Sequence, residues 1–185
     1  MYTMFLKRFF TILLLFTFVS NSIAQHEKSE WVIGTSLAFA KFTDFQGTIL
    51  GGSIVQQSPR INVTKYLFNA FSADIGFSTA AFDTQSYSTF DGVLRYDFGT
   101  SLSNRVPYLL LGGSYVVAEE TTPTLNIGAG TTFWVKPNYG INLQFMYKFS
   151  EDRFESQYSH FYPSIGFVYS FKSRNLNPRL WDRKH

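Results

Sequence analysis

Residues 140–149 read Gly-Ile-Asn-Leu-Gln-Phe-Met-Tyr-Lys-Phe, and large apolar side chains take every second position. Successive side chains of a β-strand point to opposite faces, so this run predicts a strand with one large apolar face and one smaller, more polar face. Seven other runs of the 185-residue chain show the same alternation, some less regularly: 31–40, 60–67, 71–78, 90–98, 108–117, 125–133 and 161–171. The sequence therefore predicts eight strands and an all-β fold.

The composition restricts the kind of all-β protein. Hydrophobic residues make up 45 %, aromatic residues 19 % and charged residues 16 %, yet the mean hydropathy is only −0.04. So many aromatic and so few charged residues exclude intrinsic disorder. Beyond residue 20, no run approaches the roughly 20 apolar residues of a membrane-spanning helix. A soluble sandwich and a membrane barrel remain.

The smaller face of the strands distinguishes these two folds. The outer face of a soluble sandwich should carry many lysines and glutamates. Here that face consists of Gly, Ser, Ala, Asn and Thr with a few charges. Small polar residues fit the narrow interior of an eight-stranded barrel, and the large apolar residues would then face lipid. The sequence predicts an eight-stranded antiparallel up-and-down transmembrane β-barrel.

The connectors between the strands alternate in length. The longer set comprises residues 43–58, 83–88, 118–123 and 150–160, whereas 68–70 and 136–139 are tight and 99–106 is intermediate. Barrels of the bacterial outer membrane have long extracellular loops and short periplasmic turns. We therefore expect the longer set at the extracellular end.

The amino terminus has the pattern of a secretory signal peptide. Lys7 and Arg8 are the only charges in the first 25 residues, and an apolar stretch from 9 to 19 follows. Ser22-Ile23-Ala24 places small residues at the −3 and −1 positions of a cleavage site before Gln25. The predicted division is a signal peptide at 1–24, a barrel at 25–171 and a basic periplasmic tail at 172–185.

Charge and cysteine content exclude several functions. Loss of Lys7 and Arg8 with the signal peptide lowers the formal charge from +3 to +1. A nearly neutral chain with scattered basic residues does not fit nucleic-acid binding. The chain has no cysteine, which excludes disulfides, cysteine metal sites, thiol catalysis and a lipoprotein anchor.

The last predicted strand contains a specific motif. Residues 164–171 read Ser-Ile-Gly-Phe-Val-Tyr-Ser-Phe and resemble the carboxy-terminal assembly signal of bacterial outer-membrane barrels. Ser164, Gly166, Tyr169 and Phe171 occupy its polar, glycine and aromatic positions. The resemblance implies recognition by the barrel assembly machinery during insertion. Pro163 lacks a backbone donor, so we expect it at a rim or bulge.

A wider resemblance covers residues 31–171. It is carried by Phe-Asp-Gly-Val-Leu-Arg-Tyr-Asp-Phe-Gly at 90–99, Val-Pro-Tyr at 106–108 and Thr-Pro-Thr-Leu-Asn-Ile-Gly-Ala-Gly at 122–130. These segments resemble the small OmpA-type outer-membrane β-barrel domains of the Bacteroidetes group, which implies an outer-membrane location. Many relatives continue into a domain that binds peptidoglycan. Only residues 172–185 follow the barrel here, so we expect no peptidoglycan anchoring.

Several charged and polar residues fall on the predicted interior face: Asp74, Asp91, Arg95, Asp97, Gln144 and Lys148. Charges buried in a narrow interior must pair. We expect Asp74, Asp91, Arg95, Asp97 and Lys148 to form one salt-bridged network, with Arg95 between Asp91 and Asp97 and Asp74 contributed by the neighbouring strand. Such a network would fill and rigidify the barrel; the alternative is an ion path through a narrow porin-like channel.

A lipid-modifying enzyme, such as a lipid A deacylase, is a further alternative. It would need a serine nucleophile, a histidine base and a carboxylate within hydrogen-bond reach. Ser159 and His160 are adjacent and point to opposite faces, Ser164 is about 13 Å from His160 along an extended strand, and Glu155 precedes them in a loop. His26 and His185 lie in the terminal segments. We therefore expect no catalytic site and no enzyme.

The sequence also lacks the patterns of cofactor and metal sites. It contains no glycine-rich phosphate loop, no tandem carboxylate loop and no cluster with metal-ligand spacing. We expect no cofactor and no metal.

The tail at 172–185 has a net charge of +4. Its basic residues suit anionic lipid headgroups, and Arg179, Trp181 and Arg183 are candidates for docking a partner. The sequence as a whole predicts a non-enzymatic outer-membrane barrel with a structural or protein-interaction role. Its expected partners are outer-membrane lipid, the assembly machinery during insertion and a periplasmic or outer-membrane protein.

Overall fold

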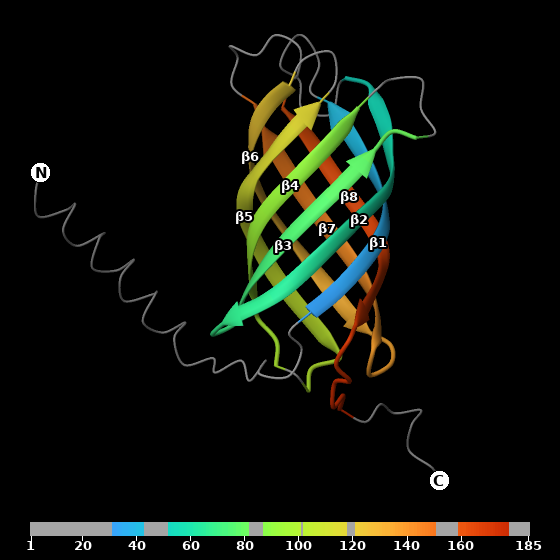
Figure 1. Ribbon diagram of the computed structural model, residues 1–185, viewed down its shortest axis with the longest axis vertical. Helices are drawn as coiled ribbons and strands as arrows, with labels where there is room; N and C mark the ends of the chain where they lie inside the picture. Colours follow the sequence, from blue (N-terminus) through green and yellow to red (C-terminus); the bar gives the residue numbers. More distant parts are fainter. Residues whose placement is uncertain are drawn as a thin grey trace, which may run out of the picture.

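The computed structural model describes residues 31–42, 52–81, 87–100, 102–117, 121–150 and 159–177. These residues form eight strands: β1 (Trp31–Phe42), β2 (Ile54–Phe68), β3 (Phe71–Thr79), β4 (Ser88–Asp97), β5 (Arg105–Val117), β6 (Thr121–Trp134), β7 (Tyr139–Phe149) and β8 (His160–Ser170). Each strand pairs antiparallel with the next, and β8 pairs with β1 to close the barrel (Figure 1). The predicted closed eight-stranded barrel is confirmed.

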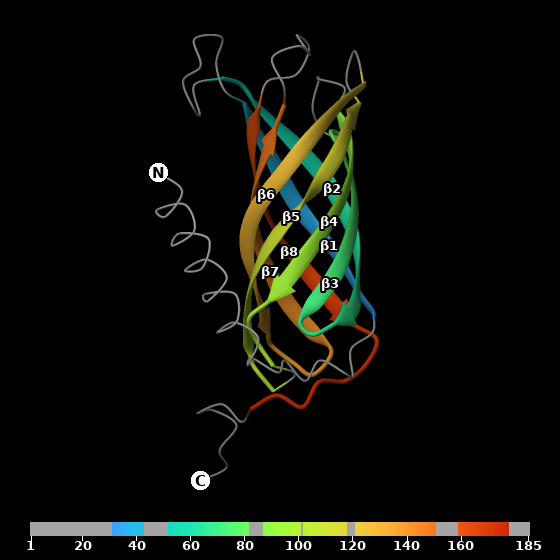
Figure 2. The ribbon, with the colours of Figure 1, turned by 90° about the vertical axis from the view of Figure 1, so that its left-hand side faces the viewer.

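The two ends of the barrel differ in their connectors. One end of the barrel, which we call the turn end, carries the connectors at 69–70, 98–104 and 135–138. We call the opposite end the loop end. Asn69 and Ala70 have φ angles of 42° and 75°. Two central residues with positive φ define the tight turn that matches the twist of a two-residue hairpin. Residues 171–177, which follow β8, also lie at the turn end (Figure 2).

Two predicted connectors are shorter than the sequence indicated. β2 begins at Ile54 rather than near residue 59, and β6 begins at Thr121, so that connector spans only 118–120. The alternation in the sequence did not indicate the start of β2, because the register of β2 against β1 shifts there. The adjacent residues Gln57 and Ser58 are both buried, which interrupts the period of two. The start of β6 consists of threonines and a proline, which carry no clear apolar alternation.

Pro163 does not lie at a rim or bulge, contrary to the prediction. It is the fourth residue of β8 and pairs with Phe145 of β7 in an unshifted register. On the other side, the pairing of β8 with β1 passes from Ser164 to Phe161 without pairs between them. Its missing donor is tolerated because the ladder toward β1 is interrupted there.

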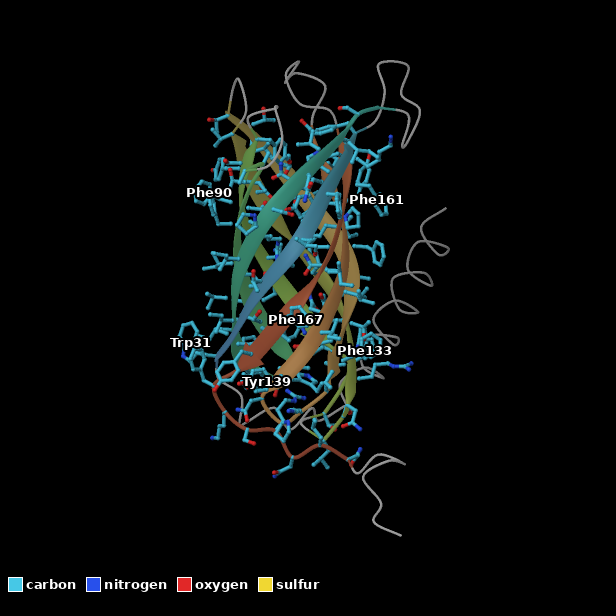
Figure 3. All side chains as sticks on the ribbon, turned by 90° about the vertical axis from the view of Figure 1, so that its right-hand side faces the viewer. Trp31, Phe90, Phe133, Tyr139, Phe161 and Phe167 are labelled. Atoms are coloured by element: carbon cyan, nitrogen blue, oxygen red, sulfur yellow. The ribbon has the colours of Figure 1, made fainter. Side chains whose placement is uncertain are left out.

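Large apolar side chains cover the outside of the barrel. Ile75 is 69 % exposed and Phe167 is 71 % exposed, whereas their neighbours Asp74 and Val168 point inward and are buried. Figure 3 shows Trp31, Phe133 and Tyr139 toward the turn end, and Phe90 and Phe161 toward the loop end. Aromatic residues near both ends of an exposed apolar band are typical of a barrel in a lipid bilayer.

No helix among the described residues is long and apolar enough to cross a membrane.

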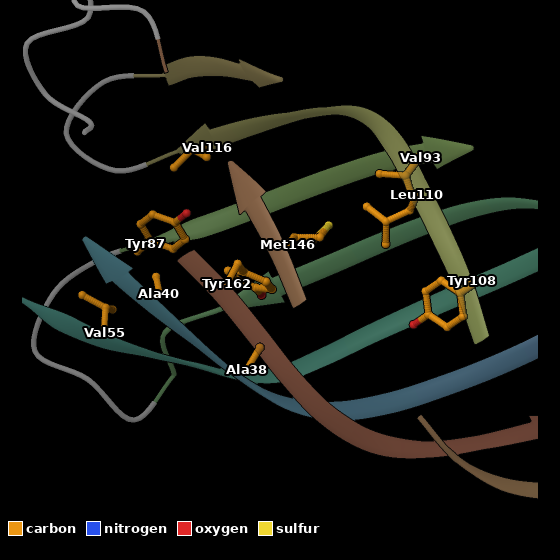
Figure 4. Packing of buried hydrophobic residues seen from close by; sticks show 10 residues of the cluster. All are labelled: Ala38, Ala40, Val55, Tyr87, Val93, Tyr108, Leu110, Val116, Met146 and Tyr162. Atoms are coloured by element: carbon orange, nitrogen blue, oxygen red, sulfur yellow. The ribbon is translucent and has the colours of Figure 1, made fainter. Parts of the chain in front are cut away.

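The interior is packed in layers. One apolar cluster contains Ala38, Ala40, Val55, Tyr87, Val93, Tyr108, Leu110, Val116, Met146 and Tyr162. Figure 4 shows Tyr162 and Met146 between Tyr87 on one side and Tyr108 on the other. A smaller cluster at the turn end joins Val106, Trp134 and Val168 to Val32 and Leu176. Polar and charged side chains fill the space between and beside these clusters.

Candidate functional site

A group of four charged side chains occupies the middle of the barrel. Lys148 Nζ of β7 lies 2.6 Å from Asp91 Oδ1 of β4. Arg60 Nη2 of β2 lies 3.3 Å from Asp91 Oδ2 and 3.7 Å from Asp74 Oδ1 of β3. We call these four residues the central charge cluster. It contains two cations and two anions, so it is electrically neutral, and all four side chains are at most 4 % exposed.

Hydroxyl and amide groups complete the cluster around Asp91. Ser114 and Thr89 donate to Asp91 Oδ1 at 2.7 Å and 2.9 Å, and Lys148 also donates to Thr89 at 2.7 Å. The amide of Asn126 in turn donates to Ser114. Buried charges stabilise a fold only when most of their hydrogen-bonding capacity is met, and this carboxylate approaches that condition.

One of the two carboxylate oxygens of Asp74 accepts hydrogen bonds from side chains. Its Oδ2 accepts from Thr64 at 2.5 Å and from Asn62 at 2.7 Å. These contacts join β2 to β3, and those of Asp91 join β4 to β2, β5 and β7. The central charge cluster therefore ties five strands together across the interior.

An aromatic layer lies between the central charge cluster and the loop end. The Lys148 ammonium is 4.3 Å from the ring centroid of Tyr162, whose hydroxyl is 2.6 Å from Ser78 Oγ. Nearer the loop end, Tyr87 Oη lies 2.7 Å from His160 Nε2, and the His160 ring packs against Phe42. These aromatic rings fill the interior between the central charge cluster and the loop end.

A second charge group lies nearer the turn end. Arg95 Nε is 2.7 Å from Asp97 Oδ1, and Ser72 donates to Asp97 Oδ2 at 3.1 Å. The Arg95 guanidinium stacks 3.6 Å from the Tyr108 ring centroid and donates to Thr132 at 3.3 Å. Beside this pair is a cavity in which about 40 Å³ is open to the centres of water molecules. We call it the turn-end chamber.

Residues 171–177 run across the turn end of the barrel (Figure 2), where Arg174 lines the turn-end chamber, and we call them the strap. The backbone amide of Arg174 donates to Pro137 O and that of Asn177 donates to Leu102 O, both at 3.0 Å. Leu176 packs against the small apolar cluster at the turn end. The strap is therefore held to two turns and to the core.

Arg174 is the side chain by which the strap enters the chamber. It is 5 % exposed, lies 4.5 Å over the Trp134 ring and donates to Thr100 O at 3.0 Å. Burial lowers the pKa of Arg174 to about 10; Asp97 opposes this change and Arg95 adds to it. A guanidinium remains charged at neutral pH, so the lowered pKa reflects the cost of burying the cation.

The structure divides the predicted interior network into two groups. Asp74, Asp91 and Lys148 belong to the central charge cluster, whereas Arg95 pairs with Asp97. Arg95 lies between Asp91 and Asp97 along β4 as expected, but the expected single network was wrong, because Arg95 forms an ion pair with Asp97 and none with Asp91 or Asp74. Arg95 lies four residues from Asp91, about 13 Å along a strand, with Val93 between them on the same face.

Sequence reasoning missed Arg60 and the burial of Arg174. Arg60 precedes Asn62 and Thr64 at two-residue spacing on the interior face of β2, which is the signal that could have identified it. Arg174 lies beyond the last strand, and no periodicity marks it. Gln144, also expected inside, is buried near Tyr108.

The residues of the motif at 164–171 lie on both faces of β8. Ser164 faces the interior, and a Cβ at position 166 would collide with Thr35 and Ser36 of β1. Tyr169 and Phe171 face outward with their ring centroids 5.4 Å apart. The role of these four residues as an assembly signal stays a prediction.

The candidate catalytic residues make separate contacts. Ser159 Oγ bonds to the backbone of Ser150, whereas His160 bonds to Tyr87 inside the barrel. Glu155, His26 and His185, the signal peptide, and the docking candidates Arg179, Trp181 and Arg183 lie outside the described residues. Within the described ranges, no three His, Cys, Asp or Glu side chains group in a way that could hold a metal ion.

The closed barrel, its apolar exterior and its polar filled interior define a transmembrane β-barrel of the outer-membrane class. A closed antiparallel barrel with an apolar outer wall is the form in which proteins span the bacterial outer membrane, and the protein is accordingly an outer-membrane barrel.

Comparison with known proteins supports this fold. No protein-family model matches the chain, and no curated protein matches it. Among solved structures, the N-terminal β-barrel domain of Pseudomonas aeruginosa OprF is similar at a TM-score of 0.61 and 12 % identity, over 78 % of this chain and 98 % of that one.

Two other outer-membrane proteins have the same fold. For OprG from Pseudomonas aeruginosa the TM-score is 0.57 at 13 % identity, covering 82 % of this chain and 100 % of that one. For Ail, the attachment invasion locus protein of Yersinia pestis, it is 0.53 at 16 % identity, covering 78 % and 98 %. These structures match the whole barrel.

Proposed function

We propose that the protein is a non-enzymatic outer-membrane barrel with a structural or protein-interaction role in the cell envelope. The observation that carries this proposal is the filled interior. Arg60 is 1 % exposed and Lys148 is completely buried, so the middle of the barrel holds a neutral plug. An open porin-like channel would need a continuous polar path, which eight strands seldom leave.

With the interior filled, binding is left to the rims, the outer wall and the tail. The turn end faces the periplasm in this proposal, and lipid contacts the outer wall. Ser164, Gly166, Tyr169 and Phe171 serve the assembly machinery during insertion, and Arg179, Trp181 and Arg183 dock an envelope protein. The sequence resemblance to small OmpA-type barrel domains of Bacteroidetes supports such a role.

The interaction role is tested by recovering partners from detergent-solubilised outer membranes. The tagged full chain is compared with a chain that ends at Asn177, which keeps the strap but lacks the docking candidates. A matched variant carries Arg179→Gln, Trp181→Ala and Arg183→Gln. We expect one envelope protein to be retained by the full chain and lost from both others. Equal recovery by all three would contradict docking through the tail.

The non-enzymatic part of the proposal needs its own measurement. Mass spectrometry of lipid A from cells with and without the protein should show the same acyl chains in both. A change in acylation that depends on Ser159 or His160 would establish the enzyme alternative and overturn this proposal.

A further inference from the structure

The turn-end chamber contains more positive than negative charge. The central charge cluster balances two cations with two carboxylates. Among the described residues that line the chamber, Arg95 and Arg174 supply two guanidinium groups, and Asp97 is the single carboxylate. Asp97 is bound to Arg95 at 2.7 Å. One buried positive charge therefore has no carboxylate of its own.

The unbalanced charge belongs to Arg174. One end of its guanidinium donates to a backbone carbonyl, but its Nε is buried and has no hydrogen-bond partner. The lowered pKa of Arg174 agrees with a cation that is buried without full compensation. A buried charge is costly unless an opposite charge or several hydrogen bonds offset it.

The chamber has room and polar groups for a small anion. Its 40 Å³ exceeds the roughly 10–15 Å³ that one water requires. Asn62, Thr132 and Asn142 contribute amide and hydroxyl groups to its wall. Arg95 projects from β4, and Arg174 closes the mouth from the strap. Two guanidinium groups that line one small cavity can donate charge-assisted hydrogen bonds to an anion.

We propose that the turn-end chamber binds one small monovalent anion of about the size of chloride, held between Arg95 and Arg174. The anion neutralises the chamber as the two carboxylates neutralise the central charge cluster. Because Arg174 belongs to the strap, binding also holds the strap across the mouth. The site thus links anion occupancy to closure of the turn end.

Bromide is a suitable probe because it is a heavy halide that quenches tryptophan fluorescence. Trp134 lines the chamber and contacts Arg174. The full chain, folded in detergent with gluconate as the bulky starting anion, is titrated with bromide at constant ionic strength. We expect a saturable quenching component that chloride competes away, that sulfate does not, and that Trp134→Phe removes.

Charge variants test the assignment of the site. Arg174→Gln should weaken bromide binding by roughly tenfold or more, the factor that accompanies loss of a charge-assisted hydrogen bond. Arg105→Gln is the matched control, because Arg105 lies over Phe133 on the outer face of the same end. Its titration should match that of the unmodified protein.

Several outcomes would overturn the proposal. Quenching that rises linearly without saturation, or that is the same in Arg174→Gln, would show a chamber filled by water only. If sulfate reduces the bromide quenching as much as chloride does, the effect is general screening of charge and not binding at a site for small monovalent anions. The unmodified protein is also informative alone, because an anion bound to the folded state must raise the thermal transition. A transition that does not respond to chloride at constant ionic strength would contradict the site.

Discussion

The charged residues of the central charge cluster interact across strands rather than along one strand. Arg60 and Asp91 are 31 positions apart in sequence, and Lys148 and Asp91 are 57 apart, yet both pairs are in contact. By contrast, Arg95 bonds to Asp97 two positions away on the same strand. The interior therefore contains two electrostatic units, the central charge cluster and the Arg95–Asp97 pair. Substitutions can test whether these units stabilise the barrel independently.

Arg95→Ala should destabilise the barrel because it leaves Asp97 buried without its cation. We expect the free energy of unfolding to fall by roughly 3–5 kcal/mol, measured by urea unfolding in lipid vesicles. Adding Asp97→Asn should recover part of this loss. Adding Asp74→Asn should not, because Asp74 belongs to the central charge cluster.

The variant that combines Arg95→Ala with Asp97→Asn and the variant that combines Arg95→Ala with Asp74→Asn serve as controls for each other. Equal recovery by Asp97→Asn and Asp74→Asn would show that the two units act as one network. That result would restore the arrangement expected from the sequence and contradict the division seen in the structure.

Among the elements, β8 carries the predicted assembly signal at its turn end. Phe171 and Phe161 both face outward near opposite ends of β8, and each has one aromatic neighbour, Tyr169 and Tyr147 respectively. Phe171 is 66 % exposed whereas Phe161 is half-buried, so ordinary hydrophobic contact predicts the larger loss for Phe161→Ala and an assembly role predicts the larger loss for Phe171→Ala.

Phe171→Ala should reduce the amount of folded barrel in outer membranes severalfold more than Phe161→Ala. The reason is that only Phe171 occupies the terminal aromatic position of the motif. The measurement is quantitative blotting of outer-membrane fractions, beside the unfolding free energy of each purified variant. If both variants lose the same amount of folded barrel in cells and the same unfolding free energy, Phe171 is an ordinary lipid-facing aromatic residue without a role in assembly.

The strap is the second element that can be tested alone. A chain ending at Lys172 lacks the Arg174 side chain and Leu176, whereas a chain ending at Asn177 keeps the strap. Both lack Trp181, so they share Trp31 and Trp134. We expect acrylamide, a neutral quencher, to reach Trp134 more readily in the shorter chain because the mouth is open.

The barrel of the shorter chain should remain folded, since all eight strands are retained. The heat-dependent shift of the band on a gel checks this. The same acrylamide quenching in both chains would contradict a strap that covers the chamber.

The elements themselves were predictable because alternation is local. The period of two indicated all eight strands, and the small second face indicated a barrel. The start of β2 and the position of Arg60 were not predictable, because the register shift near Ser36 and Ala38 arises from pairing between strands. Arg174 was missed for a similar reason: its burial depends on Trp134 and the turns it meets, far away in sequence.

At the scale of the whole molecule, the closed ladder should make the barrel resist detergent. We expect the protein to fractionate with outer membranes and to migrate differently on a gel before and after boiling. Every strand is paired on both sides, so unfolding has no free edge at which to begin. Recovery as a soluble periplasmic species without a heat-dependent shift would contradict the membrane barrel.

Conductance tests whether the filled interior is a plug or a pathway. A permeating ion would have to pass the central charge cluster, where Arg60 and Lys148 are packed among their carboxylates, and then the aromatic layer of Tyr162, Tyr87 and His160. Passage would strip the ion of water at a tightly packed layer in which most polar groups already have partners, which is strongly unfavourable. In planar bilayers we therefore expect only small and irregular currents from protein whose heat-dependent gel shift confirms that it is folded. Asp91→Ala combined with Lys148→Ala removes one anion and one cation of the central charge cluster while leaving the exterior unchanged, and it should increase the current. Stable, large, ion-selective currents from the unmodified protein would instead show that the interior is a channel.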